Sequence, residues 1–453
     1  TNNTAVGFQA LINYKTVSYN TAVGYMCMGG GSASGAGNTG TQNTMMGRYT
    51  GHSITTGNNN SGFGMEVLYA VTTGGSNTAM GFYANQLLTT GNFNVSIGQQ
   101  AGRTSVDGGG NVLVGYQAGY TNTSGSNNVA IGTTAGYSST TSNCTYVGHE
   151  AGYTNATGAN MTAVGFQALY SSTANNNTAF GLYAGLSTTT GGANTFLGLQ
   201  SGNNNTTGAS NVMVGMQAGY NNTTGSTNTY MGYAAGYGNG AGTGEGNTAI
   251  GFYSQKDKGT SGNYNTSLGF YALGSDQNAG FTGTGNTSGG YYSQRFTSSG
   301  SYNTTFGYIA GERLTSGTNN TLIGAEAGTG SAPSGQLTSE SNRVCLGNNS
   351  VSHLYCKVST ITTSDRRDKG KFEEIKLGLD FVDKLKPTAF EFKKDGLRDT
   401  EKTDGIKRYG FIAQDILELE GDNPVIINND RPENLMYSQG NLIPILVNAI
   451  QEL

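Results

Sequence analysis

The sequence predicts a mostly β protein, in which a repetitive parallel β-solenoid rod is followed by a small α+β domain. Three observations lead to this fold class: a motif that returns about every 17 residues, a composition with 74 glycines and 5 prolines in 453 residues, and a sharp rise in charge near residue 341. Length alone would allow about three ordinary domains. The composition instead indicates two different kinds of chain joined end to end.

The repeat is marked by a glycine that follows a short apolar segment, as in NTAVGFQA at 3–10, NVLVGYQA at 111–118 and NTLIGAEA at 320–327. A period of this length is typical of a solenoid, in which each coil stacks on the one before it. Twenty glycines, called the anchor glycines, occupy this position, and most are 17 residues apart: 7, 24, 47, 64, 81, 98, 115, 132, 148, 165, 181, 198, 215, 232, 251, 269, 290, 307, 324 and 347.

Each column of the repeat predicts a role in the coil. The residue before the anchor glycine is large and apolar in nineteen of twenty copies, and the residue two places earlier is always Thr, Ser or Val. Two such positions share one face of a strand, and we expect that face to point into the coil. Asn stands four places before the glycine in seventeen copies, where stacked amides can form a hydrogen-bonded ladder.

Two other kinds of repetitive chain fit the sequence poorly. A flexible Gly/Ser/Asn linker would not keep a bulky apolar residue in one column over some 340 residues. A collagen helix needs Gly at every third position and abundant Pro, whereas all five prolines lie at residue 333 or later. The absence of Pro from the repeats suits a ladder that uses every backbone N–H.

A coil of about 17 residues encloses little space, so a single thin rod would bury little apolar surface. Three copies around a common axis would bury more, with the positions after the glycine facing a neighbour. The Asn-x-x-apolar-Gly core resembles the head repeat of trimeric autotransporter adhesins, although the period here is longer. The resemblance implies a homotrimeric β-roll, with an intertwined triple β-helix as the alternative. Twenty coils at roughly 4.8 Å each would form a rod about 95 Å long.

The charged region begins with SDRRDKGKFEEI at 364–375 and continues with LGLDFVDKLKPTAFEFK at 377–393. GFIAQD at 410–415 and a final apolar helix ending in AIQEL at 449–453 follow. In this order the motifs closely resemble the intramolecular chaperone domain at the C-termini of endosialidases and other phage tail fibres and spikes. We therefore expect a fibre shaft at residues 1–348, a connector at 349–363 and a self-cleaving chaperone at 364–453.

The resemblance implies a reaction as well as a fold. Domains of this family trimerise, guide the folding of the preceding fibre and then cut themselves off beside the motif serine. Carried over, Ser364 is the nucleophile, Lys369 its base, and the bond between Ser364 and Asp365 the one that breaks. Lysine can act as a base where burial or nearby cations lower its pKa, and Arg366, Arg367 and Lys371 supply such cations. The alternative is a solvated charged loop in which Ser364 caps a helix.

The function predicted in this way is a structural virion fibre or spike that binds a host receptor. Its partners would be two further copies of itself, the virion tail or baseplate, and a host surface glycan or protein; it would be made in the host cytoplasm. A bacterial surface trimeric adhesin is the alternative. We set aside an ice-binding solenoid, because the Thr column is expected to point inward. No activity on an external substrate is predicted.

Composition gives no indication of a cofactor, a metal, nucleic acid or membrane insertion. Cys27, Cys144, Cys345 and Cys356 are scattered, without CxxC spacing or a neighbouring His, so we expect buried or half-buried free thiols. The net charge of −4 is too small to suggest nucleic acid as a partner. No apolar run is long enough to cross a bilayer.

Overall fold

The computed structural model describes residues 2–15, 17–30, 38–238, 240–256, 261–274, 280–355, 366–393, 401–422, 424–429, 432 and 435–453. The chain divides into two compact units. The first, called the rod, comprises Thr1–Thr329 and Leu337–Leu346; the second, called the C-terminal unit, comprises Gly330–Gln336 and Gly347–Leu453.

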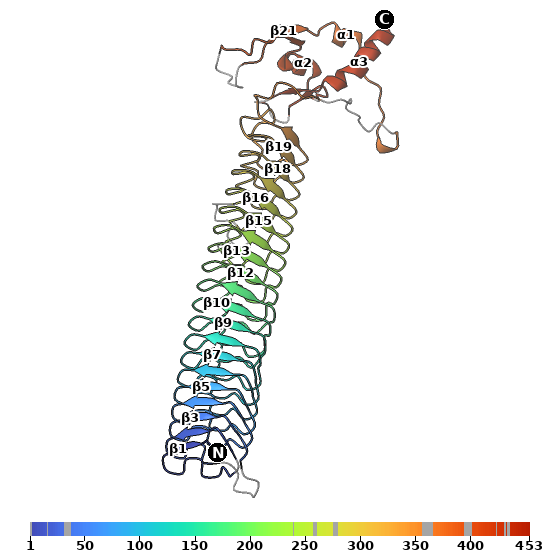
Figure 1. Ribbon diagram of the computed structural model, residues 1–453. Helices are drawn as coiled ribbons and strands as arrows, with labels where there is room; N and C mark the ends of the chain where they lie inside the picture. Colours follow the sequence, from blue (N-terminus) through green and yellow to red (C-terminus); the bar gives the residue numbers. More distant parts are fainter. Residues whose placement is uncertain are drawn as a thin grey trace. The chain divides into compact units, whose positions relative to one another are not determined.

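The rod is a stack of coils, each of which contributes one three-residue strand to a parallel sheet of twenty strands (Figure 1). Every strand ends at the residue before an anchor glycine, so the predicted β-solenoid is confirmed. The strands are β1 Thr4–Val6, β2 Thr21–Val23, β3 Thr44–Met46, β4 Ser61–Phe63, β5 Thr78–Met80, β6 Val95–Ile97, β7 Val112–Val114, β8 Val129–Ile131, β9 Thr145–Val147, β10 Thr162–Val164, β11 Thr178–Phe180, β12 Thr195–Leu197, β13 Val212–Val214, β14 Thr229–Met231, β15 Thr248–Ile250, β16 Thr266–Leu268, β17 Thr287–Gly289, β18 Thr304–Phe306, β19 Thr321–Ile323 and β20 Val344–Leu346.

Each strand pairs with strands of the neighbouring coils in the same chain. In β7, for example, Val112 lies opposite Val95 of β6 and Val129 of β8. The bonding continues past the strand, since the Gly119 N–H donates to the Ala135 carbonyl at 2.9 Å. This is the pairing of a solenoid formed by one chain. An intertwined triple β-helix, in which ladder partners belong to different chains, does not have it.

The prediction that the apolar column before the glycine lies inside the coil is wrong. These side chains lie on the outer face: Phe180 is 51% exposed and Leu197 47%. The Thr column shares that face, so its expected inward orientation is wrong too. In every strand after β1 the middle residue is buried instead, as with Leu113 and Phe196. The physical reason is that first and third residues of a strand share one face and the second takes the other, and the narrow coil accommodates one column.

Residues of complementary size fill the interior of the rod. A Cβ on Gly202 would lie 2.2 Å from the Phe196 ring, so the ring occupies the space that a side chain would need. In some coils with a small middle residue, as at Gly62, the residue six places later is large and buried, here Leu68. All seven large middle residues have glycine six places later: Met45, Leu113, Tyr146, Phe196, Met213, Tyr230 and Leu322.

The predicted asparagine ladder is confirmed. The Asn111 side-chain oxygen accepts the backbone N–H of Asn128 at 3.0 Å, while its Nδ2 donates to the Asn94 oxygen at 3.1 Å and to the Gly125 carbonyl at 2.9 Å. These amides are buried, and their hydrogen bonds offset the cost of removing them from water. The ladder runs from Asn3 to Asn128 and again from Asn177 to Asn320.

The anchor glycines recur because the backbones of successive coils approach closely there. Gly115 has a φ of +137°, and a Cβ at this position would lie 2.4 Å from the Gly132 carbonyl oxygen. Only glycine adopts this backbone conformation readily. The glycine column therefore sets the spacing between coils.

The C-terminal unit is a small α+β structure, as predicted. Its elements are the 3₁₀ helix η1 (Arg366–Asp368), α1 (Leu379–Val382), β21 (Thr388–Phe390), β22 (Arg408–Gly410), α2 (Ala413–Glu420), β23 (Ile427–Asn428), β24 (Met436–Tyr437) and α3 (Gln439–Glu452). Two antiparallel pairs form, β21 with β22 and β23 with β24. Its core consists of side chains that are at most 6% exposed: Phe381, Ile416, Ile426, Ile427, Leu442 and Ile445.

Candidate functional site

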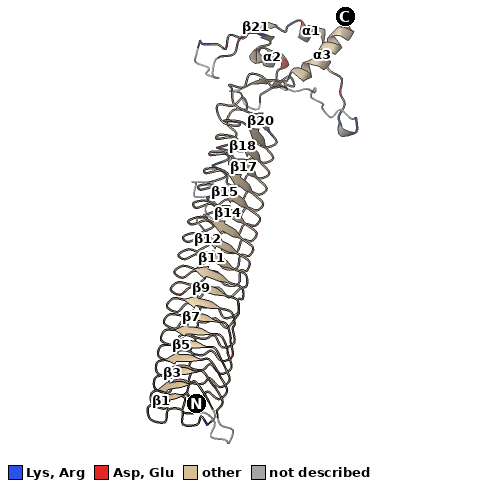
Figure 2. Cartoon of the chain, viewed as in Figure 1, with Lys and Arg blue, Asp and Glu red and all other residues tan. Residues whose placement is uncertain are grey.

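Charge separates the two units of the chain. Only 16 of the 50 charged residues precede residue 341, and the rod is almost entirely tan in Figure 2. The border segment predicted to carry the reaction is described from Arg366 onward. Ser364 and Asp365, the predicted nucleophile and cleavage position, lie outside the described residues.

The predicted base, Lys369, and its two supporting residues lie on one short turn. Arg366 and Arg367 belong to η1, and the Lys369 backbone N–H donates to the Arg366 carbonyl at 3.3 Å. The Arg366 guanidinium lies 5.0 Å from the centre of the Phe372 ring. All three basic side chains are exposed. The structure thus places the predicted base beside its supporting cations, and the pairing of Ser364 with Lys369 stays a prediction.

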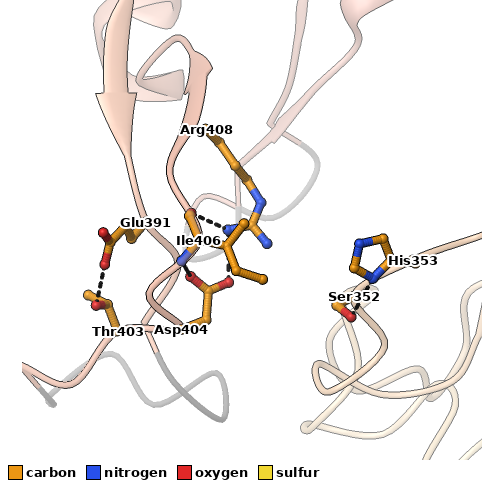
Figure 3. A network of polar contacts seen from close by, with 7 residues as sticks. All are labelled: Ser352, His353, Glu391, Thr403, Asp404, Ile406 and Arg408. Carbon is orange, nitrogen blue, oxygen red and sulfur yellow. Dashed lines mark hydrogen bonds and ion pairs between the residues drawn. The ribbon is translucent and has the colours of Figure 1, made fainter.

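A second polar cluster fastens the chain between β21 and β22 (Figure 3). The Asp404 carboxylate accepts the Ile406 N–H at 3.1 Å and pairs with the Arg408 guanidinium at 2.8 Å. The Ile406 N–H, followed by Arg408, lowers the pKa of Asp404 below its usual value. Thr403 donates to Glu391 beside this turn. Because the polar groups satisfy one another, we assign the cluster a structural role.

Figure 3 also shows Ser352 and His353, whose Oγ and Nδ1 atoms are 2.8 Å apart. A serine next to an imidazole suggests a nucleophile with its base. These two residues are adjacent in sequence and both are exposed, so water competes for the imidazole. We assign the pair no catalytic role.

Sequence reasoning missed the residues that hold the C-terminal unit together. The two carboxylate oxygens of Glu420 accept the N–H groups of Val425, Ile426 and Ile427 at 2.6–2.9 Å. This carboxylate fixes the start of β23 against the end of α2. A signal was present in the sequence, because Glu420 directly precedes Gly421, a residue typical of helix ends.

Helix α3 makes the second set of fastening contacts. The Asn448 amide donates to the Leu377 carbonyl at 3.1 Å, and Glu452 accepts the Leu379 N–H at 2.5 Å. Both contacts hold the segment that leads into α1. No sequence pattern indicated them, since the partners are about 70 residues apart.

Helix α3 also carries an apolar stripe that the C-terminal unit leaves exposed. Leu442, Ile445 and Ala449 are buried, whereas Ile443 is 59% and Ile450 69% exposed. Leu446 and Val447 lie between the last two in sequence and are exposed as well. Positions three, four and seven residues apart form one face of a helix. The helix therefore has two apolar faces.

Other candidate sites are limited in the described part of the chain. No group of three His, Cys, Asp or Glu residues there could hold a metal ion. Cys27 and Cys144 are buried free thiols, as expected, and Cys345 is buried; Cys356 lies outside the described residues. Of the helices described, none combines the length and the hydropathy that a membrane span requires.

Comparisons with known proteins bear on the C-terminal unit alone. Neither a curated protein nor a solved structure matches the chain. A protein-family model described as chaperone of endosialidase matches residues 364–423, and the match begins at Ser364. After a β-solenoid rod of twenty strands, the chain therefore carries a segment that matches the model of the endosialidase-chaperone family.

Proposed function

We propose that this protein is a tail fibre-like structural protein whose domain at residues 364–453 unites three copies, guides folding of the shaft at 1–348 and then cuts itself off. One observation carries the proposal: a match to the chaperone of endosialidase begins at Ser364, after a rod of twenty similar coils. The combination of rod and chaperone segment fits a tail fibre-like protein. The connector at 349–363 joins the two.

The rod has a physical need for a folding guide. Its coils are alike, so a strand such as β7 could pair with the wrong coil at little cost in local energy. Contacts between several chains, which must align coil by coil, form slowly as well. A module with a single unique core supplies one starting register. The C-terminal unit has such a core around Phe381 and Ile416.

The exposed stripe of α3 supports association of three copies. Ile443, Val447 and Ile450 follow the spacing of a coiled-coil seam, and their exposure leaves apolar surface to be buried. Packing three such helices together would remove this surface from water.

The proposed cleavage is a hydrolysis within the chain. The peptide bond between Ser364 and Asp365 breaks; with one water consumed, the Ser364 carbonyl carbon gains a hydroxyl group and the Asp365 nitrogen gains a proton. Lys369 accepts the proton of the Ser364 hydroxyl as the serine oxygen attacks the carbonyl carbon, and it passes this proton to the Asp365 nitrogen as the peptide bond breaks. Water then hydrolyses the resulting ester and restores the Ser364 hydroxyl. A lysine acts as a base when burial or nearby cations favour its neutral form. Because Lys369 is exposed in a single chain, we expect a neighbouring copy to enclose it, so that cleavage follows trimerisation.

The test compares wild type with Ser364→Ala, Lys369→Ala and the control Lys376→Ala, an exposed lysine outside the predicted site. Denaturing electrophoresis and intact mass should find a fragment of residues 1–364 in wild type and the control, and a whole chain in the other two. Light scattering should give a trimeric mass for all four proteins. Cleavage that persists in Ser364→Ala would show that the nucleophile is wrongly assigned. A monomeric mass would overturn the assembly itself.

The location on a virion tail, the synthesis in a host cytoplasm and the host receptor are the finer parts of this proposal. They rest on the kind of protein in which the chaperone segment occurs, and a bacterial surface adhesin is the alternative. Immunogold labelling with an antibody against the rod distinguishes the two. Label on virion tails supports the fibre, whereas label confined to the cell envelope supports the adhesin.

A further inference from the structure

The rod carries an uncharged face on its outside, which is formed by the first and third residues of β1–β20 and is called here the outer strand face. The first residue is Thr, Ser or Val, and the third residues, which are large and apolar in every strand but β17, form an apolar stripe along this face. No charged residue occupies any of these forty positions. Thirteen of the third residues are 38–57% exposed: Val6, Met46, Met80, Ile97, Ile131, Phe180, Leu197, Met231, Ile250, Leu268, Phe306, Ile323 and Leu346.

The one gap in the stripe is filled by the next coil. Gly289 stands where the other coils have a large apolar residue, and the Phe306 ring occupies the space above it, 2.3 Å from where a Cβ would lie. The stripe is therefore continuous along the rod.

The exposed area is larger than a lone soluble chain usually presents. A large apolar side chain has on the order of 200 Å² of surface, and those in the stripe are about 40% exposed or more. Thirteen of them leave on the order of 1,000 Å² in contact with water, above the roughly 300–600 Å² of the largest patch on a typical monomer. About 800 Å² per partner suffices for a stable protein interface.

The coils keep this face clear although they differ in length. Every one of the twenty strands has three residues and is followed directly by its anchor glycine. The longest spacings, from Gly24 to Gly47 and from Gly324 to Gly347, leave this arrangement of strand and glycine unchanged. A surface that stays uncharged over twenty coils indicates a partner that extends along the whole rod.

The edge of the outer strand face is apolar in the later coils as well. Tyr233, Phe252, Phe270, Tyr291 and Tyr308, each next to an anchor glycine, stack on one another with ring centres 5.0–5.4 Å apart. Stacked rings of this kind bury area at protein contacts.

We infer that the outer strand face is the surface through which copies of the rod pack along their length. The inference rests on the proposed trimer and adds the face that it uses. A second copy has the same coil spacing and the same number of coils, so it alone matches the stripe coil by coil. The side chains favour a protein partner over an ice lattice, because Phe180, Met231 and Leu197 differ in size and would disturb a flat array of Thr.

The first test uses thiol accessibility at two positions that differ only in face. Leu197→Cys places a thiol on the outer strand face, and the control Thr207→Cys places one on an exposed turn ten residues later. Both are made with Cys356→Ser; Cys27, Cys144 and Cys345 are buried. In the assembled protein a maleimide should modify the thiol from Leu197→Cys at least tenfold more slowly. Mild oxidation should link chains in Leu197→Cys and leave Thr207→Cys unlinked.

The second test adds a charge at the same two positions. Leu197→Asp should abolish the trimeric mass or the soluble yield, because three carboxylates would meet in a dry interface, while Thr207→Asp should change neither. A trimer in which both thiols react equally fast overturns the inference and leaves the proposed function standing. A monomeric wild-type protein overturns both. A monomer that slows ice recrystallisation would assign the face to ice instead.

Discussion

The rod and the C-terminal unit reach stability in different ways. The rod stacks one coil on the next, with a backbone ladder, an asparagine ladder and a narrow interior in which Phe196 fills the space left by Gly202. The C-terminal unit has a conventional core of large side chains. Glu420 and Asn448 then fasten segments that are not part of its helices.

The two regions also differ in how well their contacts specify which segments pair. Each coil of the rod makes the same contacts as its neighbours, so the contacts specify the shape of a coil but not which coil pairs with which. In the C-terminal unit each contact occurs once. The unique contacts can therefore set a starting point from which the repeated ones follow.

The largest effect is expected from emptying the rod interior. Phe196→Ala should lower the free energy of unfolding by about 3–5 kcal/mol, since it leaves a cavity in a fully buried site. Tyr409→Ala in the C-terminal unit, where the side chain is 82% exposed, should change it by less than about 0.5 kcal/mol. Chemical denaturation followed by circular dichroism measures both. Equal losses would contradict the assigned interior.

Replacing glycine by alanine should have opposite signs in the two regions. Gly115→Ala strains a φ of +137° and forces a Cβ to 2.4 Å from the Gly132 oxygen, so we expect a loss of at least about 2–3 kcal/mol. Gly440→Ala lies in α3 with no atom within 4 Å of the added carbon, and should stabilise by up to about 1 kcal/mol. Thermal unfolding midpoints decide the signs; a stabilised Gly115→Ala would refute the role of the glycine column.

Removing one side-chain amide should lower the free energy of unfolding more in the rod than in the C-terminal unit. Asn211→Ala leaves the buried N–H of Asn228 without its acceptor and removes one of the two amides that donate to the Gly225 carbonyl, at a cost of about 1–3 kcal/mol. Asn448→Ala removes a hydrogen bond to the Leu377 carbonyl, which lies in a partly exposed place. We expect a loss of stability of about 0.5–1.5 kcal/mol. Denaturation curves of the two variants test the order. A cost that is larger for Asn448→Ala would show that the ladder adds little.

The smallest effects on the free energy of unfolding should appear at extremes of pH. The rod should lose stability at high pH and the C-terminal unit at low pH. Burial raises the pKa of the Cys27 thiol from 9.0 to about 12 and raises the pKa of the Tyr230 phenol above its usual value. Above pH 9 these groups ionise in the unfolded chain while they stay neutral in the folded one, so the rod should lose stability as pH rises. Tyr230→Phe should reduce that loss. If the slope is unchanged, the buried phenol is not its source.

In the C-terminal unit the lowered pKa of Asp404 works in the other direction. Its carboxylate stays ionised in the folded chain, so it contributes stability above the ordinary value of 3.8 that is lost as pH falls below it. Asp404→Asn should flatten the acid limb without altering the alkaline one. Unfolding midpoints from pH 2 to 11 test both limbs in one series.

Some of these features could be predicted from sequence and others could not. The strand ends and the asparagine ladder followed from columns that repeat in every coil. The inward face was assigned wrongly, because the large apolar residues before the anchor glycines, such as Leu197, suggested a core. The pairing of large Phe196 with Gly202, repeated in six other coils, was the signal that would have corrected it. The contact between Asn448 and Leu377 joins distant segments and left no pattern to read, and Ser364 lies outside the described residues.

The direction of the ladder also decides how the rod responds to force. The hydrogen bonds between coils, such as that from the Gly119 N–H to the Ala135 carbonyl, point along the stacking axis. Tension along this axis loads one coil's bonds at a time and peels the end coil away from the next. Each event releases about 17 residues, or roughly 60 Å of extended chain. A single rod pulled from its ends should therefore lengthen in small, even steps and dissipate mechanical energy at each step. Under compression the stacked coils stay in contact, and the rod resists shortening.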